Sequence, residues 1–152
     1  MIGIVAFSFG LSEEEPNEAN RALAELVQDI SSEIHCVVVA QWEIAKALRT
    51  TPAQCVVMHH SIAGKYLDSE EVMAQAAKLF RERGITEVLP IAQPFLHLAK
   101  CKTLVRKSGF TLVPYHPPHG IPFPKDSKQW WTRGPLQLLL YAVLQKFLGR
   151  RG

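Results

Sequence analysis

The chain has 152 residues, of which 47% are hydrophobic and 20% charged, and its formal net charge is +3. These values are typical of one globular domain, residues 1–152, with a sizeable core. The basic residues form short, scattered clusters rather than a stripe interleaved with aromatic residues, so a nucleic-acid-binding protein is not favoured.

Continuous apolar runs, typical of strands buried on both faces, alternate with segments of helical periodicity along the chain. The predicted strands are residues 2–8, 34–40, 54–58, 86–92 and 110–115. The predicted helices are residues 17–32, 41–48, 69–83, a segment that Pro94 opens and Gly109 ends, and 134–149. Asn17 and Asp68 are the expected N-caps, and Gly84 is expected to end the third helix.

The alternation predicts an α/β fold, a single Rossmann-like domain with a mainly parallel five-stranded sheet and helices on both faces. Ligands of such folds bind in the crevice outside the carboxyl ends of the strands. Five of the six histidines follow predicted strands, and they are His59, His60, His97, His116 and His119. The sequence therefore predicts a site at this edge of the sheet.

The two ends of the chain and its cysteines bear on location. The apolar N-terminus has no basic residues before it and runs into Glu13-Glu14-Glu15, which predicts a first strand rather than a signal peptide. Three cysteines without CxxC spacing indicate free thiols in a reducing cytoplasm. The apolar segment Leu136 to Leu148 is too short to cross a bilayer. We expect a buried final helix there, and the alternative is a membrane-surface helix ending in Gly149-Arg150-Arg151.

The first two strand ends offer candidate ligand contacts with two interpretations each. Ser8 and Gly10 follow the first strand, where a glycine lets backbone N–H groups approach an anion or merely permits the turn. Glu43 follows the second strand in the first turn of a helix. It either complements the helix dipole or faces the crevice, as an acceptor for hydroxyl groups or as a base.

The later strand ends supply an imidazole and a lid. His97 falls in the first turn of a helix, where the dipole would lower its pKa and favour the neutral form, so we predict an acid/base or hydrogen-bonding role. His116 begins a proline-rich loop that Trp131 and Arg133 close. Trp131 would be a platform for a flat ligand and Arg133 a partner for carboxylate or phosphate, unless the tryptophans only cover the sheet edge.

Two other classes of function stay open. Histidines from several loops could hold a metal, giving a metal-dependent hydrolase that uses His59 or His60 with His116 and His119. No carboxylate or thiolate accompanies them at ligand spacing, so we assign no metal ligand. The other alternative is a catalytically inactive scaffold, in which Trp130 and the final helix form an interface with a partner or in a homo-oligomer.

Several motifs in order along the chain carry a resemblance to a known family. They are Asn-Arg-Ala-Leu at 20–23, the acidic residue of Gln-Trp-Glu-Ile-Ala at 41–45, Asp-Ser-Glu-Glu at 68–71, Arg-Gly-Ile-Thr-Glu-Val-Leu-Pro-Ile-Ala at 83–92, and Lys-Ser-Gly-Phe-Thr-Leu-Val-Pro-Tyr at 107–115. Together they resemble the SanA/YdcF/ElyC-like family of domains of unknown function. The resemblance implies a Rossmann-like domain whose strand-end pocket binds a nucleotide-like ligand, S-adenosylmethionine included, and a role in the bacterial envelope.

The resemblance also implies site residues, and the sequence departs from it at others. The matching positions are Gly10, Arg21, Glu43, Ser69, Glu71 and His97. Val72 replaces an asparagine, Ala92-Gln93 a serine pair and Lys100 an arginine, and we keep Gln93 and Lys100 as candidate ligand contacts. The family's N-terminal membrane segment is missing, so we expect no integral membrane segment. Our leading hypothesis is a cytoplasmic domain that holds an anionic, nucleotide-like or phosphorylated small molecule, with or without turnover.

Overall fold

A computed structural model describes residues 1–11, 15–94, 96–116 and 120–148. The described residues form a five-stranded sheet in the order β3-β2-β1-β4-β5, and every neighbouring pair of strands is parallel. The strands are β1 (Ile2–Ala6), β2 (Cys36–Gln41), β3 (Cys55–Val57), β4 (Glu87–Ile91) and β5 (Thr111–Leu112). The predicted α/β fold, with its parallel sheet, is confirmed.

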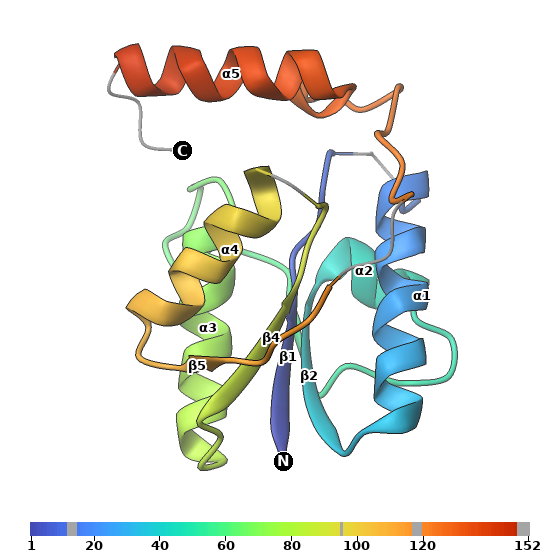
Figure 1. Ribbon diagram of the computed structural model, residues 1–152, viewed down its shortest axis with the longest axis vertical. Coiled ribbons are helices and arrows are strands. Elements are labelled where there is room, and N and C mark those ends of the chain that lie inside the picture. The colour runs from blue at the N-terminus through green and yellow to red at the C-terminus, as the bar shows by residue number, and fades with distance from the viewer. Residues whose placement is uncertain (12–14, 95, 117–119, 149–152) are drawn as a thin grey trace.

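The helices cover both faces of the sheet and one of its edges (Figure 1). They are α1 (Glu18–Glu33), α2 (Trp42–Ala47), α3 (Ser69–Glu82), α4 (Leu96–Lys107), the 3₁₀ turn η1 (Trp130–Thr132) and α5 (Pro135–Leu148). Helices α1 and α2 lie on one face, and α3 and α4 lie on the other. Helix α5 runs across the end of the molecule opposite the N-terminus, over the carboxyl ends of the strands.

The core consists of two layers because successive side chains of a strand point to opposite faces of the sheet. Val5 and Phe7 pack on the side of α3 and α4, in a cluster that includes Phe80. Ile4 and Ala6 pack on the side of α1 and α2, in a cluster that includes Leu23. Burial on both faces explains why the central strands are continuous apolar runs rather than alternating ones.

The predicted signals for helix ends are confirmed. The side chain of Asn17 accepts a hydrogen bond from the backbone N–H of Asn20, and that of Asp68 accepts one from Glu71. Gly84 follows α3 with a φ of 67°, a conformation that glycine adopts without strain.

The strand order locates the crevice. From β1 the chain crosses to β2 on one side of it, whereas β4 returns to the other side of β1. The loops after β1 and β4 therefore separate at the middle of the sheet, and this switch point is where α/β folds bind ligands. It lies beneath α5 (Figure 1).

Two expectations need correction. The fifth strand is confined to Thr111–Leu112 rather than residues 110–115, since only its first residues pair with β4. The final helix was expected to be buried, yet none of the residues of α5, all of which the structure describes, is buried. The physical reason is that α1 to α4 already cover both faces of the sheet, which leaves α5 only the strand-end edge.

Candidate functional site

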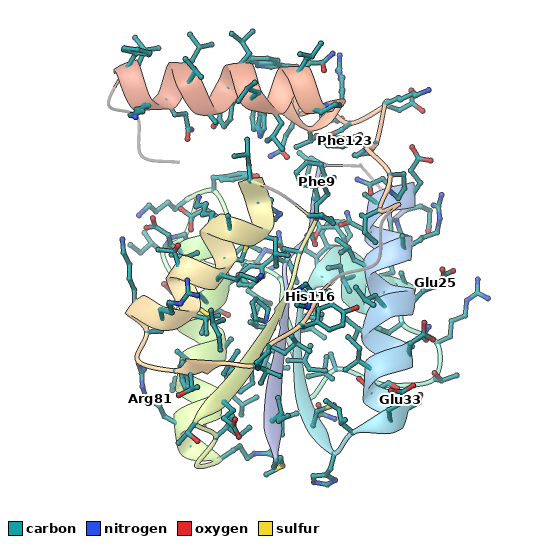
Figure 2. The ribbon with its side chains drawn as sticks, viewed as in Figure 1. Phe9, Glu25, Glu33, Arg81, His116 and Phe123 are labelled. Carbon is teal, nitrogen blue, oxygen red and sulfur yellow. The ribbon has the colours of Figure 1, made fainter. Side chains whose placement is uncertain are left out.

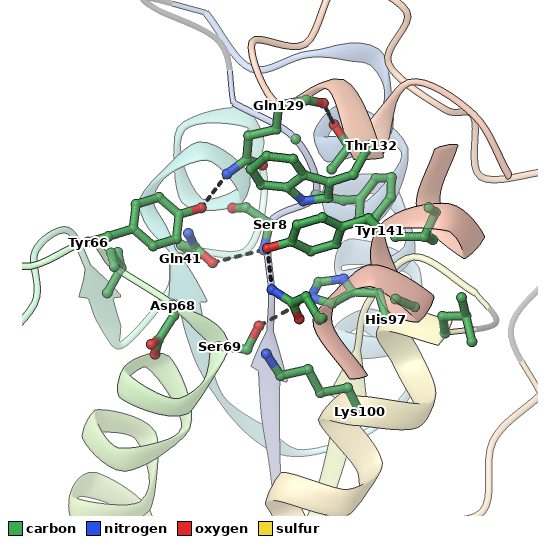
Figure 3. A pocket seen from close by; sticks show the side chains of 18 residues that line it. Ser8, Gln41, Tyr66, Asp68, Ser69, His97, Lys100, Gln129, Thr132 and Tyr141 are labelled. Atoms are coloured by element: carbon green, nitrogen blue, oxygen red, sulfur yellow. Dashed lines mark hydrogen bonds between the residues drawn. The ribbon is translucent and has the colours of Figure 1, made fainter. Parts of the chain in front are cut away.

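A pocket of about 510 Å³ lies between the carboxyl ends of the strands and α5. Figure 3 shows side chains converging on it from the sheet, from the starts of α3 and α4, and from α5. The lining residues are Ser8, Phe9, Gly10, Gln41, Tyr66, Leu67, Asp68, Ser69, Leu96, His97, Lys100, Gln129, Trp131, Thr132, Leu138, Tyr141, Ala142 and Gln145. Its size suits a small organic ligand.

Half of the predicted site residues line this pocket. They are Ser8, Gly10, Ser69, His97, Lys100 and Trp131. Their elements are distant in sequence, and the parallel sheet brings them to one edge because all its strands end there. Glu43 lies behind this lining, only 2% exposed.

Ser8 connects the pocket to the buried carboxyl group of Glu43. Its hydroxyl donates a 2.8 Å hydrogen bond to Glu43 Oε2, and its backbone N–H donates to Gln41 Oε1 at 3.1 Å. Burial raises the pKa of Glu43, and the hydrogen bond from Ser8 partly offsets that rise. Because the Ser8 hydroxyl donates its hydrogen bond to Glu43, the lone pairs of Ser8 Oγ are available to accept from a ligand. Glu43 is thus a positioning group behind Ser8.

His97 lies against two phenylalanines at the base of the pocket. Its ring is 5.5 Å from that of Phe9 and 6.4 Å from that of Phe7, between centroids. Burial lowers the pKa of His97 to about 4, with a smaller contribution from the positive charge of Lys100. The predicted neutral imidazole agrees with this pKa, but burial and Lys100, rather than the helix dipole, are its causes.

The polar contacts of His97 are incomplete. Its Nε2 lies 3.3 Å from Ser69 Oγ. Its Nδ1 is buried and has no hydrogen-bond partner among the described residues. A neutral imidazole carries one N–H and one lone pair, so one of these groups stays unsatisfied here. A buried unsatisfied polar group costs free energy, and such groups are often found at functional sites.

The N-terminus of helix α4 and a lysine make the floor attractive to anions, whereas the carboxylate of Asp68 already caps the N-terminus of α3. Helix α3 begins at Ser69 and α4 at Leu96, both of which line the pocket. Helix N-termini present backbone N–H groups and a partial positive charge. Lys100 adds a full charge (Figure 3), and Asp68, whose carboxylate caps α3, is the acidic residue in the lining.

Gly10 serves the packing of the chain. Its φ is 77°, and a Cβ atom there would lie 2.7 Å from Pro124 Cγ and 2.9 Å from Ser127 Oγ. The hydroxyl of Ser127 in turn accepts hydrogen bonds from the backbone N–H of Leu11 (3.0 Å) and from Thr132 Oγ1 (2.8 Å). Of the two interpretations of Gly10, these contacts support the tight turn. The turn packs against Pro124 and Ser127, in the segment that leads to α5.

The roof of the pocket comes from the segment 129–145. The rings of Trp131 and Tyr141 stack at 4.4 Å with an interplanar angle of 10°. The side-chain amide of Gln129 donates to the hydroxyl of Tyr66, and that of Gln145 donates to the hydroxyl of Tyr141. Phe9 and Phe123 meet edge to face at 5.8 Å near the start of α5 (Figure 2). Of the predicted aromatic lid, Trp131 lines the pocket and stacks on Tyr141, a residue that the sequence did not suggest.

Five predicted residues lie outside the pocket. Arg21 Nη1 donates to the carbonyl of Pro16, and Arg133 Nε donates to that of Ser127, so the guanidinium of Arg133 holds the loop rather than facing a ligand. Glu71 accepts from the backbone N–H of Ser61 and from the side chain of Gln75, the latter being the main reason its pKa is lowered. The others are Gln93, which is 1% exposed beneath the site, and His116, which is exposed.

Sequence reasoning missed most of the roof. Tyr66 and Gln129 lie in loops without a sequence signal. Tyr141 and Gln145, however, are polar residues four apart in an apolar helix, and residues at that spacing share one helix face. Gln137, at the same spacing before Tyr141, is exposed and outside the lining, so the spacing by itself did not identify the face toward the pocket.

The described residues give the metal hypothesis no support. Among them, no three histidine, cysteine, aspartate or glutamate side chains gather closely enough to hold a metal ion. His59 and His116 are exposed, and His60 lies 3.6 Å from a carboxylate oxygen of Glu71. His119 lies outside the described residues.

Comparisons with protein-family models, with curated proteins and with solved structures find no match to this chain.

Proposed function

We propose that the protein binds an anionic small molecule, of the nucleotide-like or phosphorylated class, in the pocket beneath α5. The observation that carries this proposal is the convergence of Lys100, Ser69 and the N-terminus of α4 on one cavity of about 510 Å³. Backbone N–H groups at helix starts, hydroxyl groups and a lysine are the donors that proteins use for phosphate and carboxylate oxygens.

The rest of the lining suits a ligand with an apolar or ring-shaped part. Tyr141 stacks on Trp131 with one face, and both residues line the cavity. Leu96, Leu138 and Ala142 add apolar surface. A polar floor below an aromatic and aliphatic roof fits a molecule with an anionic end and a flatter apolar end, as nucleotides and S-adenosylmethionine have.

We favour a ligand-binding role for His97 over a role in proton transfer. A general base works best when its pKa lies near the operating pH, and the pKa of His97 is lowered to about 4. At neutral pH its imidazole is uncharged and serves to donate or accept one hydrogen bond. We therefore assign His97 a ligand-contacting role, with Glu43 acting through Ser8.

A thermal-shift screen of untagged protein tests this proposal. The panel contains S-adenosylmethionine, nucleotides, nucleotide sugars, sugar phosphates and inorganic phosphate. A ligand at about one hundred times its dissociation constant adds roughly 2.7 kcal/mol to the free energy of unfolding, which raises the melting temperature by several degrees. We expect such a shift from at least one anionic compound and none from its neutral analogue.

Single-residue variants test whether the ligand binds in the pocket. Lys100→Gln and Ser69→Ala are expected to weaken binding of the compound about tenfold or more, measured by calorimetry. Lys107→Gln is the matched control, because Lys107 is in the last turn of the same helix and outside the lining. Equal affinity of Lys100→Gln and Lys107→Gln would contradict the assignment, as would a panel without any shift.

A further inference from the structure

Helix α5 presents Tyr141 and Gln145 toward the pocket and most of its large apolar side chains outward. Leu138, Tyr141, Ala142 and Gln145 recur at helical spacing on the side that lines the pocket. The opposite side carries seven large apolar side chains that are at least 40% exposed (Figure 2). They are Leu136, Leu139, Leu140, Val143, Leu144, Phe147 and Leu148, and we call this set the outer face of α5.

The outer face is too apolar for a surface that only meets water. Phe147 is 82% exposed and Leu136 is 77% exposed. Single exposed apolar residues are common on proteins, but a contiguous apolar patch of this kind marks a surface that binds a protein or a membrane. The patch lies on the side of the helix opposite Tyr141 and Gln145, which line the pocket.

The charge around the outer face identifies the occupant. From residue 127 to the end of the sequence there is no aspartate or glutamate, whereas Lys128, Arg133, Lys146, Arg150 and Arg151 are basic. Among the described residues, Arg133 precedes the apolar set and Lys146 lies within it, and both are exposed. Trp130, at 39% exposure, adds an indole ring close to the start of the helix. Apolar side chains flanked by basic residues and a tryptophan fit the interface of an anionic lipid bilayer.

We propose that the outer face of α5 docks on the surface of an anionic membrane, with the helix axis parallel to the surface. The helix has 14 residues and is about 21 Å long, and none of the described helices is long and apolar enough to cross a bilayer. A second copy of the chain is less suited to this face. A symmetric pairing would bring two basic segments together, and the sequence offers no acidic side chain from residue 127 onward to pair with them.

Docking in this manner brings the pocket next to the lipid surface. The pocket lies directly on the inner side of α5, so one helix separates its roof residues Tyr141 and Leu138 from the membrane. A ligand that is released from, or delivered to, the bilayer would need to travel only the width of that helix. This inference concerns the outer face alone and stands whether or not the pocket binds the proposed ligand class.

Flotation with lipid vesicles tests the proposal on the full chain. One set of vesicles is phosphatidylcholine with about one-quarter phosphatidylglycerol, and the other is pure phosphatidylcholine. We expect the protein to float with the anionic vesicles, and high salt to weaken the association because it screens the basic residues. Phe147→Glu and Leu140→Glu are expected to lower the fraction bound about tenfold or more, since each removes apolar contact and adds a repelled charge.

Matched variants and the oligomeric state separate docking from the alternatives. Ile62→Glu is the control, because Ile62 is 60% exposed in the loop after β3 and belongs to another part of the surface. It is expected to float like the unchanged protein, and circular dichroism checks that the variants are folded. Failure to float with anionic vesicles would overturn the proposal. So would a dimer, seen by sedimentation in the absence of lipid, that Phe147→Glu converts to a monomer.

Discussion

Helices α3 and α5 are equally long, with 14 residues each, but the helix with more charged residues is the one that is buried. Helix α3 carries five charged residues, yet it buries Val72, Met73, Ala76, Ala77 and Phe80. Helix α5 has a single charged residue, Lys146, and buries none of its described side chains. Apolar content therefore did not decide which helix is buried.

Position in the fold explains the difference. Helix α3 connects β3 to β4 and packs on one face of the sheet, which it shares with α4. Helix α5 comes after both faces are covered and meets only the strand-end edge, through Leu138 and the pocket-lining residues. Four variants, in order from the largest expected effect to the smallest, test this contrast between the two helices.

Phe80→Ala is expected to lower the free energy of unfolding by about 3–5 kcal/mol. The side chain of Phe80 is fully buried on α3, edge to face with Phe110 at 5.9 Å, and its ring lies where a Cβ atom on Gly3 would be only 2.9 Å away. Its removal leaves a cavity that this close packing cannot fill. Urea denaturation measures the change, and a loss below about 1 kcal/mol would mean that the core under α3 relaxes freely.

His97→Gln is expected to change how stability depends on pH. Between pH 6.5 and about 4 the unfolded chain binds a proton that the folded His97 does not, so the free energy of unfolding falls as the pH falls, by up to about 3 kcal/mol. Glu43 acts in the opposite direction, because its raised pKa makes its contribution larger below pH 4.5 and smaller above it. Urea titrations at several pH values should therefore show this decline in the unchanged protein. A variant with the same decline would contradict the low pKa of His97.

Ser127→Ala is expected to cost about 1–3 kcal/mol, because it leaves the backbone N–H of Leu11 without its acceptor. The same change removes the bond to Thr132 and one link between the first loop and the segment before α5, while the bond from the backbone N–H of Lys128 to the carbonyl of Leu11 remains. Hydrogen exchange should speed up in η1 and α5 while α3 keeps its protection. Unchanged exchange in α5 would show that its position depends on other contacts, such as the stack of Trp131 on Tyr141.

Phe147→Ala is expected to change the free energy of unfolding by less than about 0.5 kcal/mol in the absence of lipid. It is the counterpart of Phe80→Ala, with the same atoms removed from a side chain that is 82% exposed. The measurement is again urea denaturation, at two protein concentrations. A loss above about 1 kcal/mol that depends on concentration would show that α5 is covered by another copy, and the contrast with α3 would then disappear.

Much of the fold could be read from the sequence because its signals are local. The apolar runs of β1 and β2, the capping side chains of Asn17 and Asp68, and Gly84 after α3 depend on residues a few positions apart. The edge at which the site lies also followed, since parallel strands all end on one side. His97 was found for this reason, whereas Ser69 and Lys100 came from the family resemblance, and all three line the pocket.

The tertiary structure alone decided which of these residues meet, and what α5 covers. Arg21, Glu71 and Arg133 have the chemistry of a site, but their contacts with Pro16, Gln75 and Ser127 engage them elsewhere. The sequence determined that α5 is an apolar helix whose few polar residues include Tyr141 and Gln145, four apart. It could not determine that these two face the pocket while Gln137 and seven large apolar side chains are exposed, because burial depends on which surface of the sheet remains open when the last helix packs.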